Sequence, residues 1–384
     1  MTGFWRAAFR PFFLGAGLWA MIAPAVWLWP DGSHDPVLWH LHELMFGMGG
    51  AAVAGYLLTA LPNWTARGAV GPGMIAALAL GWAMARAAMV LAGGLPAAIF
   101  ALLWFSALSA VLLREVVAAK AWGRVPLALV PAWLGLADMC VLWLDRLGSL
   151  WPEAPILLTL TYATLIGGIG GRAVPAFVRS WLSGRGFPDR VFAPTFLTVL
   201  GAAGTIIGAV LSLTGRNGTA STVLVLTGAG QIARMAGWAL PSALRHPPLA
   251  MLLAGWVWLG AGLVLTGLAL GFPDRLAIGD ALHGLTMGAM GTMILAIAGR
   301  AAMRRRGAEL EPPPPMLAGF ACVWLSALVR VCGPWAGLSW PDPVGLAAGL
   351  WMVGWGLFLV ALFPALRGPA PHPVLSARRG QAGQ

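Results

Sequence analysis

The chain has 384 residues, of which 59% are hydrophobic and only 10% are charged, and its formal net charge is +11. A soluble globular domain carries about 25% charged residues, so a chain this poor in charge cannot cover a surface that faces water. The composition excludes a soluble domain and indicates an integral membrane protein. The positive charges lie in short gaps between apolar blocks, where they indicate membrane topology and not a nucleic-acid partner.

Twelve apolar blocks follow one another along the chain. Most are about 20 residues long, which as a helix crosses about 30 Å of hydrocarbon. The gaps between them are short, so we expect a single membrane-embedded domain over residues 1–384 with no soluble domain. The expected fold is an all-α, polytopic transmembrane bundle of about twelve helices, near 12–30, 40–61, 72–92, 95–119, 124–146, 154–178, 191–213, 219–242, 248–271, 279–302, 315–334 and 343–366.

The lysines and arginines are distributed unequally between alternate gaps. Sixteen of the 24 lie on the side of the N-terminus, three lie on the other side, and five fall within helices. Positive residues accumulate on the cytoplasmic side of membrane proteins. We therefore expect an even number of helices, with both termini in the cytoplasm.

Three of the six histidines lie at the start of apolar blocks. His40 and His42 open the second helix, and His283 opens the tenth. Even-numbered helices run inward in this topology, so these three imidazoles begin their helices at a similar depth near the outer face. Neutral imidazole is the commonest protein ligand for transition metals, and the three together predict a metal site. The other three, His34, His246 and His372, lie in loops or in the tail.

His40 and His42 are two residues apart, about 200° around a helix, so they cannot both face one metal ion from a regular turn. We expect His42 and His283 to be the axial ligands of one haem. His40 is then left for a second metal or for ordering the site. Glu43 shares the face of His40 and could orient that imidazole or be a ligand itself.

Glycines and methionines follow the histidines at helical spacing. Gly47 follows His42, and Gly288 follows His283 on the same stripe as Met287 and Met290. Such glycines leave room for a flat cofactor, or alternatively for tight helix packing. The two methionines would contact a cofactor, supply thioether to copper, or fill the core.

An internal repeat is suggested by these residues. His42, Leu44, Gly47 and Gly50 match His283, Leu285, Gly288 and Gly291 at an offset of 241, and Tyr162 with Gly167 and Gly170 repeats the frame. The copies fall in helices two, six and ten, which would suit three repeats of four helices. We expect Tyr162 to face the same cavity as His42 and His283.

Three further charged residues lie inside apolar blocks, where a charge is costly to bury unless it has a partner or a function. Arg172 would pair with an anionic group such as a propionate, or reach to the membrane interface. Arg86 and Asp138 would form an internal ion pair or line a proton path. The pattern does not decide between these readings.

Four stretches of the chain resemble the NnrS family: Arg10-Pro-Phe-Phe; Trp39-His-Leu-His-Glu-Leu-Met-Phe-Gly with Gly55-Tyr-Leu-Leu-Thr-Ala-Leu-Pro-Asn-Trp-Thr; Gly171-Arg-Ala-Val-Pro-Ala-Phe; and His283-Gly-Leu-Thr-Met-Gly-Ala-Met-Gly-Thr-Met. The resemblance implies a multi-pass protein of the bacterial inner membrane that contains haem b and copper and acts in denitrification and the response to nitric oxide. It also implies that His40, His42 and His283 are metal ligands.

The sequence departs from the family pattern at two places. A histidine common in helix nine is absent from Leu253-Ala-Gly-Trp-Val-Trp, and a His-Thr-Gly-Arg after helix ten is replaced by Arg304-Arg-Arg-Gly. If either histidine binds copper, this chain lacks that ligand, so haem is the cofactor we expect first.

The function expected from residues and resemblance together is haem binding near the periplasmic face, in nitric oxide or nitrosative-stress metabolism. If the protein is an enzyme, it is a haem-dependent oxidoreductase that acts on nitric oxide or a related small species. Two other classes stay open: a secondary transporter that uses Glu43, Asp138, Arg86 and Arg172, and a membrane assembly factor. The expected partners are the lipid bilayer, haem and a small gaseous or redox ligand, with no nucleic acid.

Overall fold

The computed structural model describes residues 3–27, 35–148, 153–307, 309–334, 336–337, 342–371 and 373–375. His34 and His372 lie outside these residues. The all-α fold is confirmed. The strands found in the described part are β1 (Arg304–Arg306) and β2 (Glu309–Glu311), which pair antiparallel in one short hairpin.

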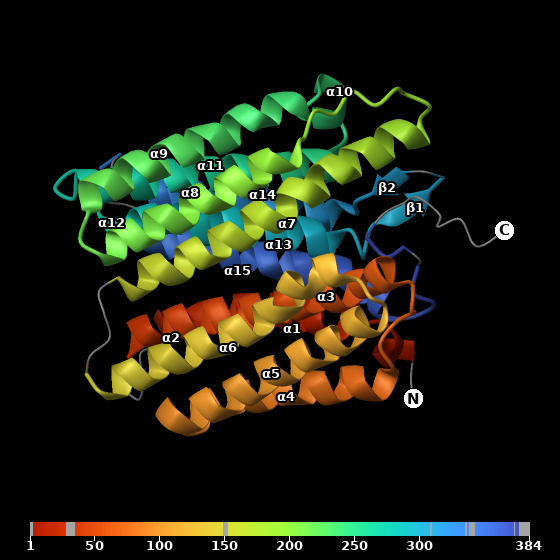
Figure 1. The fold of residues 1–384 in the computed structure, drawn as a ribbon, viewed down its shortest axis with the longest axis horizontal. Helices are drawn as coiled ribbons and strands as arrows, with labels where there is room; N and C mark the ends of the chain where they lie inside the picture. The colour runs from red at the N-terminus through yellow and green to blue at the C-terminus, as the bar shows by residue number, and fades with distance from the viewer. Residues whose placement is uncertain are drawn as a thin grey trace. The chain divides into compact units, whose positions relative to one another are not determined.

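Each of the twelve apolar blocks contains a helix (Figure 1). Among the described residues, ten helical segments are long and apolar enough to cross a membrane. The other two blocks hold α1 (Phe9–Ile22), which the 3₁₀ turn η2 (Ala23–Trp27) continues, and α9 (Asn217–Ala233), which η5 (Arg234–Gly237) continues. The protein is therefore a multi-pass membrane protein.

The chain divides into two compact units. The first unit comprises Met1–Ala154 and Leu362–Pro371, and the second comprises Pro155–Ala361 and His372–Gln384. The boundary follows the fifth expected helix, so this division does not coincide with repeats of four helices. The helices of each unit lie side by side with their axes roughly aligned (Figure 1).

The first unit begins with η1 (Gly3–Arg6) and α1. Its second span is one continuous helical segment of three parts: α2 (Pro36–His42), the π-helical turn η3 (Glu43–Met48) and α3 (Gly49–Thr65). Asp35 caps α2 by accepting hydrogen bonds from the backbone N–H groups of Val37 and Leu38. The remaining elements are α4 (Pro72–Leu91), α5 (Gly94–Ala118), η4 (Trp122–Arg124), α6 (Val125–Arg146) and η7 (Phe363–Leu366).

The second unit starts with the longest helix described, α7 (Ala154–Gly184), followed by α8 (Thr195–Leu213) and α9. A short α10 (Pro241–Leu244) precedes α11 (Pro247–Gly271). The tenth span again has three parts: α12 (Ile278–His283), the π-helical segment η6 (Gly284–Gly291) and α13 (Thr292–Gly299). The unit ends with α14 (Pro314–Cys332) and α15 (Pro343–Leu362).

Apolar side chains cover the outward faces of the helices as well as their interior. Leu80 and Leu103 in the first unit, and Phe196 and Leu226 in the second, are each more than 60% exposed. Surfaces of this kind are stable against hydrocarbon and unstable against water. The interiors are packed with rings, of which Phe12, Phe46 and Phe105 lie in the first unit and Trp238, Trp256 and Trp355 in the second.

Segments near the two ends of the chain meet in the first unit. The buried guanidinium of Arg10 donates to the carbonyl oxygens of Ala365 (3.0 Å) and Gly368 (2.7 Å), and also to that of Gly3. These carbonyls stabilise the charge of Arg10, which forms no ion pair with a carboxylate among the described residues. The contact agrees with an even number of spans, because the beginning of the first span and the end of the last lie together.

Candidate functional site

Two π-helical segments mark the positions that the sequence singled out. The segment η3 begins immediately after His42, and η6 begins immediately after His283. The two starting positions are related by the same offset of 241 that relates the two sequence frames. A π-turn widens the helix by one residue and is frequently found at functional sites. The structure thus supports the repeat between these two spans, while α7, which contains Tyr162, is an ordinary α-helix.

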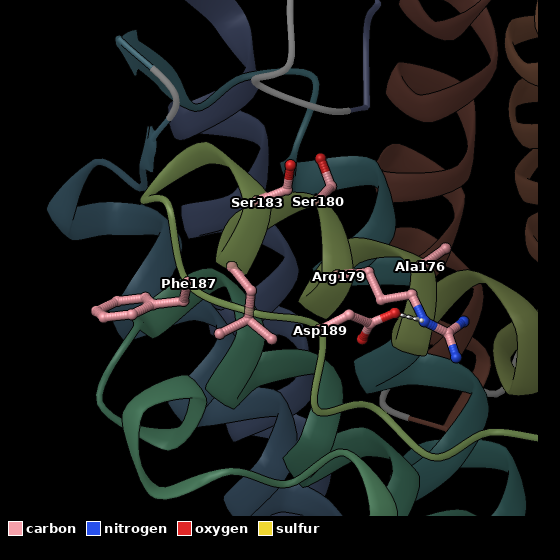
Figure 2. A pocket seen from close by; sticks show the side chains of 7 residues that line it. Ala176, Arg179, Ser180, Ser183, Phe187 and Asp189 are labelled. Atoms are coloured by element: carbon pink, nitrogen blue, oxygen red, sulfur yellow. Dashed lines mark hydrogen bonds and ion pairs between the residues drawn. The ribbon is translucent and has the colours of Figure 1, made fainter.

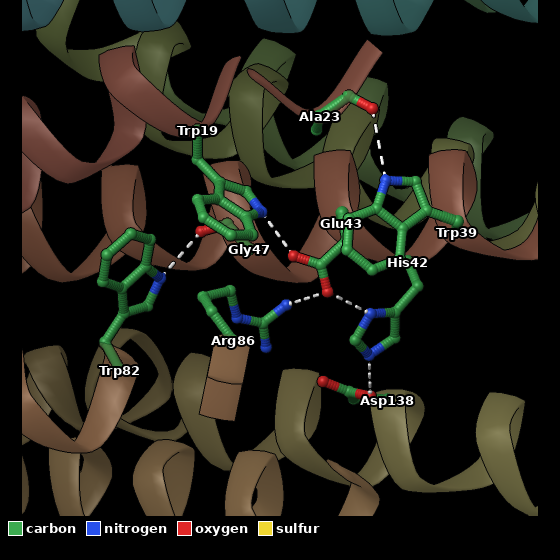
Figure 3. Close-up of polar contacts among 9 residues, drawn as sticks. All are labelled: Trp19, Ala23, Trp39, His42, Glu43, Gly47, Trp82, Arg86 and Asp138. Carbon is green, nitrogen blue, oxygen red and sulfur yellow. Dashed lines mark hydrogen bonds and ion pairs between the residues drawn. The ribbon is translucent and has the colours of Figure 1, made fainter. Parts of the chain in front are cut away.

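In the first unit, His42 lies at the centre of a network of buried side chains (Figure 3). Its Nδ1 is 2.7 Å from Oε1 of Glu43, and its Nε2 is 2.8 Å from Oδ1 of Asp138 on α6. Nη1 of Arg86 on α4 donates to the same Oε1 of Glu43 at 2.6 Å. The indole N–H of Trp19 on α1 donates to Oε2 of Glu43. Side chains from four helical spans therefore meet in one network, and three of these spans meet at the carboxylate of Glu43.

The hydrogen-bond pattern fixes how many protons this network holds. Each contact between a ring nitrogen of His42 and a carboxylate oxygen needs one hydrogen between the two atoms. The ring is then either an imidazolium between two carboxylates or a neutral imidazole beside one carboxylic acid. In both cases the formal charges of Arg86, Glu43, His42 and Asp138 cancel. Such cancellation is what a group of fully buried charges requires.

The same contacts leave no lone pair of His42 pointing at a metal ion. Both ring nitrogens are occupied by carboxylate oxygens, and the side chain is completely buried. The space beside Gly47 is also filled, because a Cβ added there would lie 2.6 Å from the indole nitrogen of Trp19. As it is folded, the surroundings of His42 do not fit an iron ligand. His40 lies two residues earlier in α2 and is half-buried.

The second unit presents His283 differently. Its Nδ1 lies 2.6 Å from the carbonyl oxygen of Gly279, and because a carbonyl oxygen only accepts, Nδ1 carries the hydrogen; in the neutral ring the lone pair is then on Nε2. This is the tautomer of metal-ligating histidines, whose other ring nitrogen typically donates to a backbone carbonyl or a carboxylate. Asp280, three residues earlier, pairs with Arg330 of α14 at 2.5 Å. The donor chemistry of His283 therefore fits a metal ligand.

The stripe that follows His283 is packed against aromatic rings. A Cβ added to Gly288 would lie 2.5 Å from Cδ2 of Trp258 on α11, and one added to Gly291 would lie 2.6 Å from Trp351. Met290 is buried, and Met287 is half-buried. Glycine in both π-segments thus admits an indole from the preceding span, Trp19 in one case and Trp258 in the other.

Buried indole groups differ between the two units. In the first unit, Trp19, Trp39, Trp82 and Trp104 each donate a hydrogen bond from the indole nitrogen. In the second unit, Trp256 also donates a hydrogen bond from its indole nitrogen. Five other buried indole nitrogens of this unit have no hydrogen-bond partner among the described residues: those of Trp181, Trp238, Trp258, Trp324 and Trp355. Unpaired buried donors are uncommon in folded proteins, and each calls for an explanation. Two of these rings, Trp258 and Trp324, pack together with their centroids 5.7 Å apart, beside η6.

The other predicted site residues are placed as follows. Tyr162 is buried in α7, at 4% exposure. Arg172 is exposed on α7 and has no hydrogen bond or ion pair among the described residues, so of its two expected roles the reach to the membrane interface is the one compatible with this position. Arg234 takes the interior position beside Gly171 instead. The described residues contain no group of three or more His, Cys, Asp or Glu arranged to hold a metal ion.

Sequence reasoning found most of the network but not its pairing. Arg86 and Asp138 were expected to pair with each other or to line a path, and the structure instead joins them through Glu43 and His42. Trp19 was not predicted, and no sequence signal distinguishes it from the other tryptophans.

A second polar recess lies in the second unit, at the end of α7 and the loop that follows it (Figure 2). It has a volume of about 250 Å³ and is lined in part by Ser180, Ser183 and Phe187. Arg179 pairs across it with Asp189 at 3.1 Å. The only charge pair that the recess displays is therefore already neutralised.

The fold and the buried histidine, carboxylate and arginine groups define a multi-pass membrane protein with polar chemistry inside its helices. A family model described as "NnrS protein" matches residues 3–370. The chain therefore belongs to the NnrS family, a membership that supports a membrane protein related to nitric oxide. A comparison with curated proteins gave no match.

Proposed function

We propose that this protein binds haem in the bacterial inner membrane and acts in nitric oxide or nitrosative-stress metabolism, with His283 as an iron ligand. The observation that carries the proposal is the tautomer of His283, whose Nδ1–H is held by Gly279 and whose Nε2 has the lone pair. Family membership supplies the link to nitric oxide. The charge distribution of the loops supports a site near the periplasmic face.

The surroundings of His283 support a polar cofactor. The unpaired indole N–H groups of Trp258 and Trp324 lie in the same unit and would donate to an acceptor such as a carboxylate. The ion pair of Asp280 and Arg330 joins α12 to α14 close to the histidine and so fixes the start of the span. Haem, when bound, would supply an iron atom able to bind nitric oxide and to exchange electrons.

His42 has a different role in this proposal. It organises charge inside the first unit, where Glu43 and Asp138 hold both of its ring nitrogens. To bind iron it would have to exchange one of these contacts for the metal. We propose these separate roles in place of the axial pairing of His42 with His283 that the sequence led us to expect; a ligand role for His40 and the presence of copper stay predictions.

The test begins with the purified full-length protein. We expect a Soret absorption band, iron at a stoichiometry comparable to the protein, and a shift of the band when nitric oxide is added without oxygen. Replacing His283 by Ala should remove or shift the band, while the control His246→Ala, at a histidine in a turn of the same unit, should leave it unchanged. A folded protein without iron and without visible absorption would refute the proposal. Metal analysis of the same sample decides whether copper is present.

A further inference from the structure

A groove runs between α8 and α9 in the second unit. It has a volume of about 240 Å³, and its apolar part is formed by Leu197, Leu200, Gly201, Gly204, Leu226 and Gly230. Leu200 and Leu226 are 65% and 67% exposed, so the groove opens on a surface that the apolar spans present to hydrocarbon. From Leu197 to Gly204 it follows α8 for about 10 Å, at 1.5 Å per residue.

Glycines give the groove its depth. A Cβ added to Gly230 would meet nothing within 4 Å, which means that open space lies directly above this residue. Gly201 and Gly204 are backed by the side chains of Gln231 and Thr227, which a Cβ would approach to 2.0 and 2.2 Å. The floor of the groove is therefore polar, while its walls are apolar.

Arg234 lies at one end of the groove and carries a charge that no described carboxylate balances. Its guanidinium donates to three neutral acceptors: Oγ1 of Thr198 at 2.8 Å, Oε1 of Gln231 at 3.1 Å and the carbonyl oxygen of Gly171 at 3.4 Å. The indole rings of Trp256 and Trp238 lie 5.2 and 5.6 Å from its central carbon. Among the described residues no Asp or Glu forms an ion pair with it.

The combination indicates one kind of occupant. A cation held in place at the end of an apolar groove favours an anion, because the partly buried charge lacks a counter-ion. A free anion would contact Arg234 and leave the apolar walls uncovered. A lipid covers both, since its phosphate and its acyl chain are joined. The side-chain amide of Gln231, whose oxygen accepts from Arg234 and whose nitrogen lies beside Gly201 in the groove, would add a hydrogen bond beside the arginine.

We propose that the groove between α8 and α9 binds one anionic phospholipid, with an acyl chain along Leu197, Leu200 and Leu226 and the phosphate against Arg234. This site is independent of haem binding and of His283. Its failure would leave the proposed function unchanged.

The full-length protein in a mild detergent provides the test, by native mass spectrometry with added phosphatidylglycerol or phosphatidylcholine. We expect one phosphatidylglycerol to be retained in preference to phosphatidylcholine. Arg234→Gln should weaken the binding of phosphatidylglycerol about fivefold, which corresponds to the attraction of one basic residue to anionic lipid. It should also remove the preference for phosphatidylglycerol over phosphatidylcholine. Arg234→Lys, which keeps the positive charge, should keep most of the preference for phosphatidylglycerol.

A second variant leaves the arginine untouched. Gly230→Leu should fill the groove and reduce the retention of both lipids, because its side chain enters open space without a clash. Gly168→Leu, which also faces open space but lies on α7 outside the groove, is the matched control and should retain lipid like the wild type. Equal retention of the two lipids by the wild type, or wild-type binding by both Gly230→Leu and Arg234→Gln, would overturn the proposal.

Discussion

The two π-helical segments share a sequence frame and a backbone form but differ in their chemistry. Each follows a histidine, and each contains a glycine on which an indole of the preceding span packs. In η3 the next residue is Glu43, which ties His42 to Arg86 and Trp19. In η6 the next residue is Gly284, so His283 has a backbone carbonyl as its partner instead. The same local frame therefore holds a buried charge network in one unit and a ligand-type histidine in the other.

The difference teaches that a repeated motif need not carry a repeated function. One difference in the frame, Glu in place of Gly after the histidine, brings in Arg86 and Trp19 from two other spans and occupies Nδ1 of His42, while Asp138 from a third span occupies Nε2. The glycines and tryptophans then serve helix packing in both copies.

Replacing Glu43 by Ala should have the largest effect. It removes the acceptor of Arg86, of the Nδ1 side of His42 and of the indole of Trp19, and leaves buried charge without compensation. We expect the free energy of unfolding to fall by about 3–5 kcal/mol. Unfolding in detergent, followed by tryptophan fluorescence, measures it.

The control is Glu115→Ala in the same unit, where Glu115 pairs with the exposed Arg67 and Arg114. A surface pair of this kind is worth about 1 kcal/mol or less. Equal effects of the two replacements would show that the network around Glu43 does not stabilise the unit.

Adding one methyl group in each π-segment should have an intermediate effect. Gly288→Ala brings a Cβ to 2.5 Å from Trp258, a ring that must then move, and we expect a loss of about 1–3 kcal/mol. Gly47→Ala should cost more, because the displaced indole of Trp19 also loses its hydrogen bond to Glu43.

Gly279→Ala, which meets nothing within 4 Å, is the control in the second unit and should be close to neutral. Thermal unfolding of the purified variants gives the comparison. If Gly288→Ala were as neutral as Gly279→Ala, the packing of indole against glycine would not hold the second π-segment.

The sequence predicted the twelve helical blocks because apolar length encodes a membrane span directly. It also located both histidine frames. It did not predict the π-turns, since hydropathy is the same for an α- and a π-helical backbone. The partners of Glu43 and His42 lie 43 and 96 residues further along the chain, and no local pattern selects them. At Gly47 and Gly288 another group does approach the helix closely, but the sequence did not indicate that this group is an indole ring.

The smallest expected effect concerns pH at a loop of the second unit. Burial lowers the pKa of His246 below 6.5. The negative charge of Glu309 raises this pKa, and the positive charges of Arg185 and Arg300 lower it further. Because the unfolded chain then takes up the proton first, the free energy of unfolding should decrease as the pH falls below about 6.5. His246→Phe would keep a ring stacked on Trp181, now at 5.2 Å, and should remove this part of the pH dependence. Unfolding curves at pH 5 and pH 8 test it; an unchanged difference between the two pH values in the variant would contradict the assignment.

The central claim is that the two histidines have separate roles, and one paired measurement tests it. The His42→Gln and His283→Gln variants are purified, and for each the Soret absorbance per folded protein is measured together with the unfolding midpoint. We predict that His283→Gln loses or shifts the Soret band at a nearly unchanged midpoint, whereas His42→Gln lowers the midpoint and keeps the band in its folded fraction. A folded His42→Gln protein that has lost its haem spectrum would contradict this account and make His42 an iron ligand.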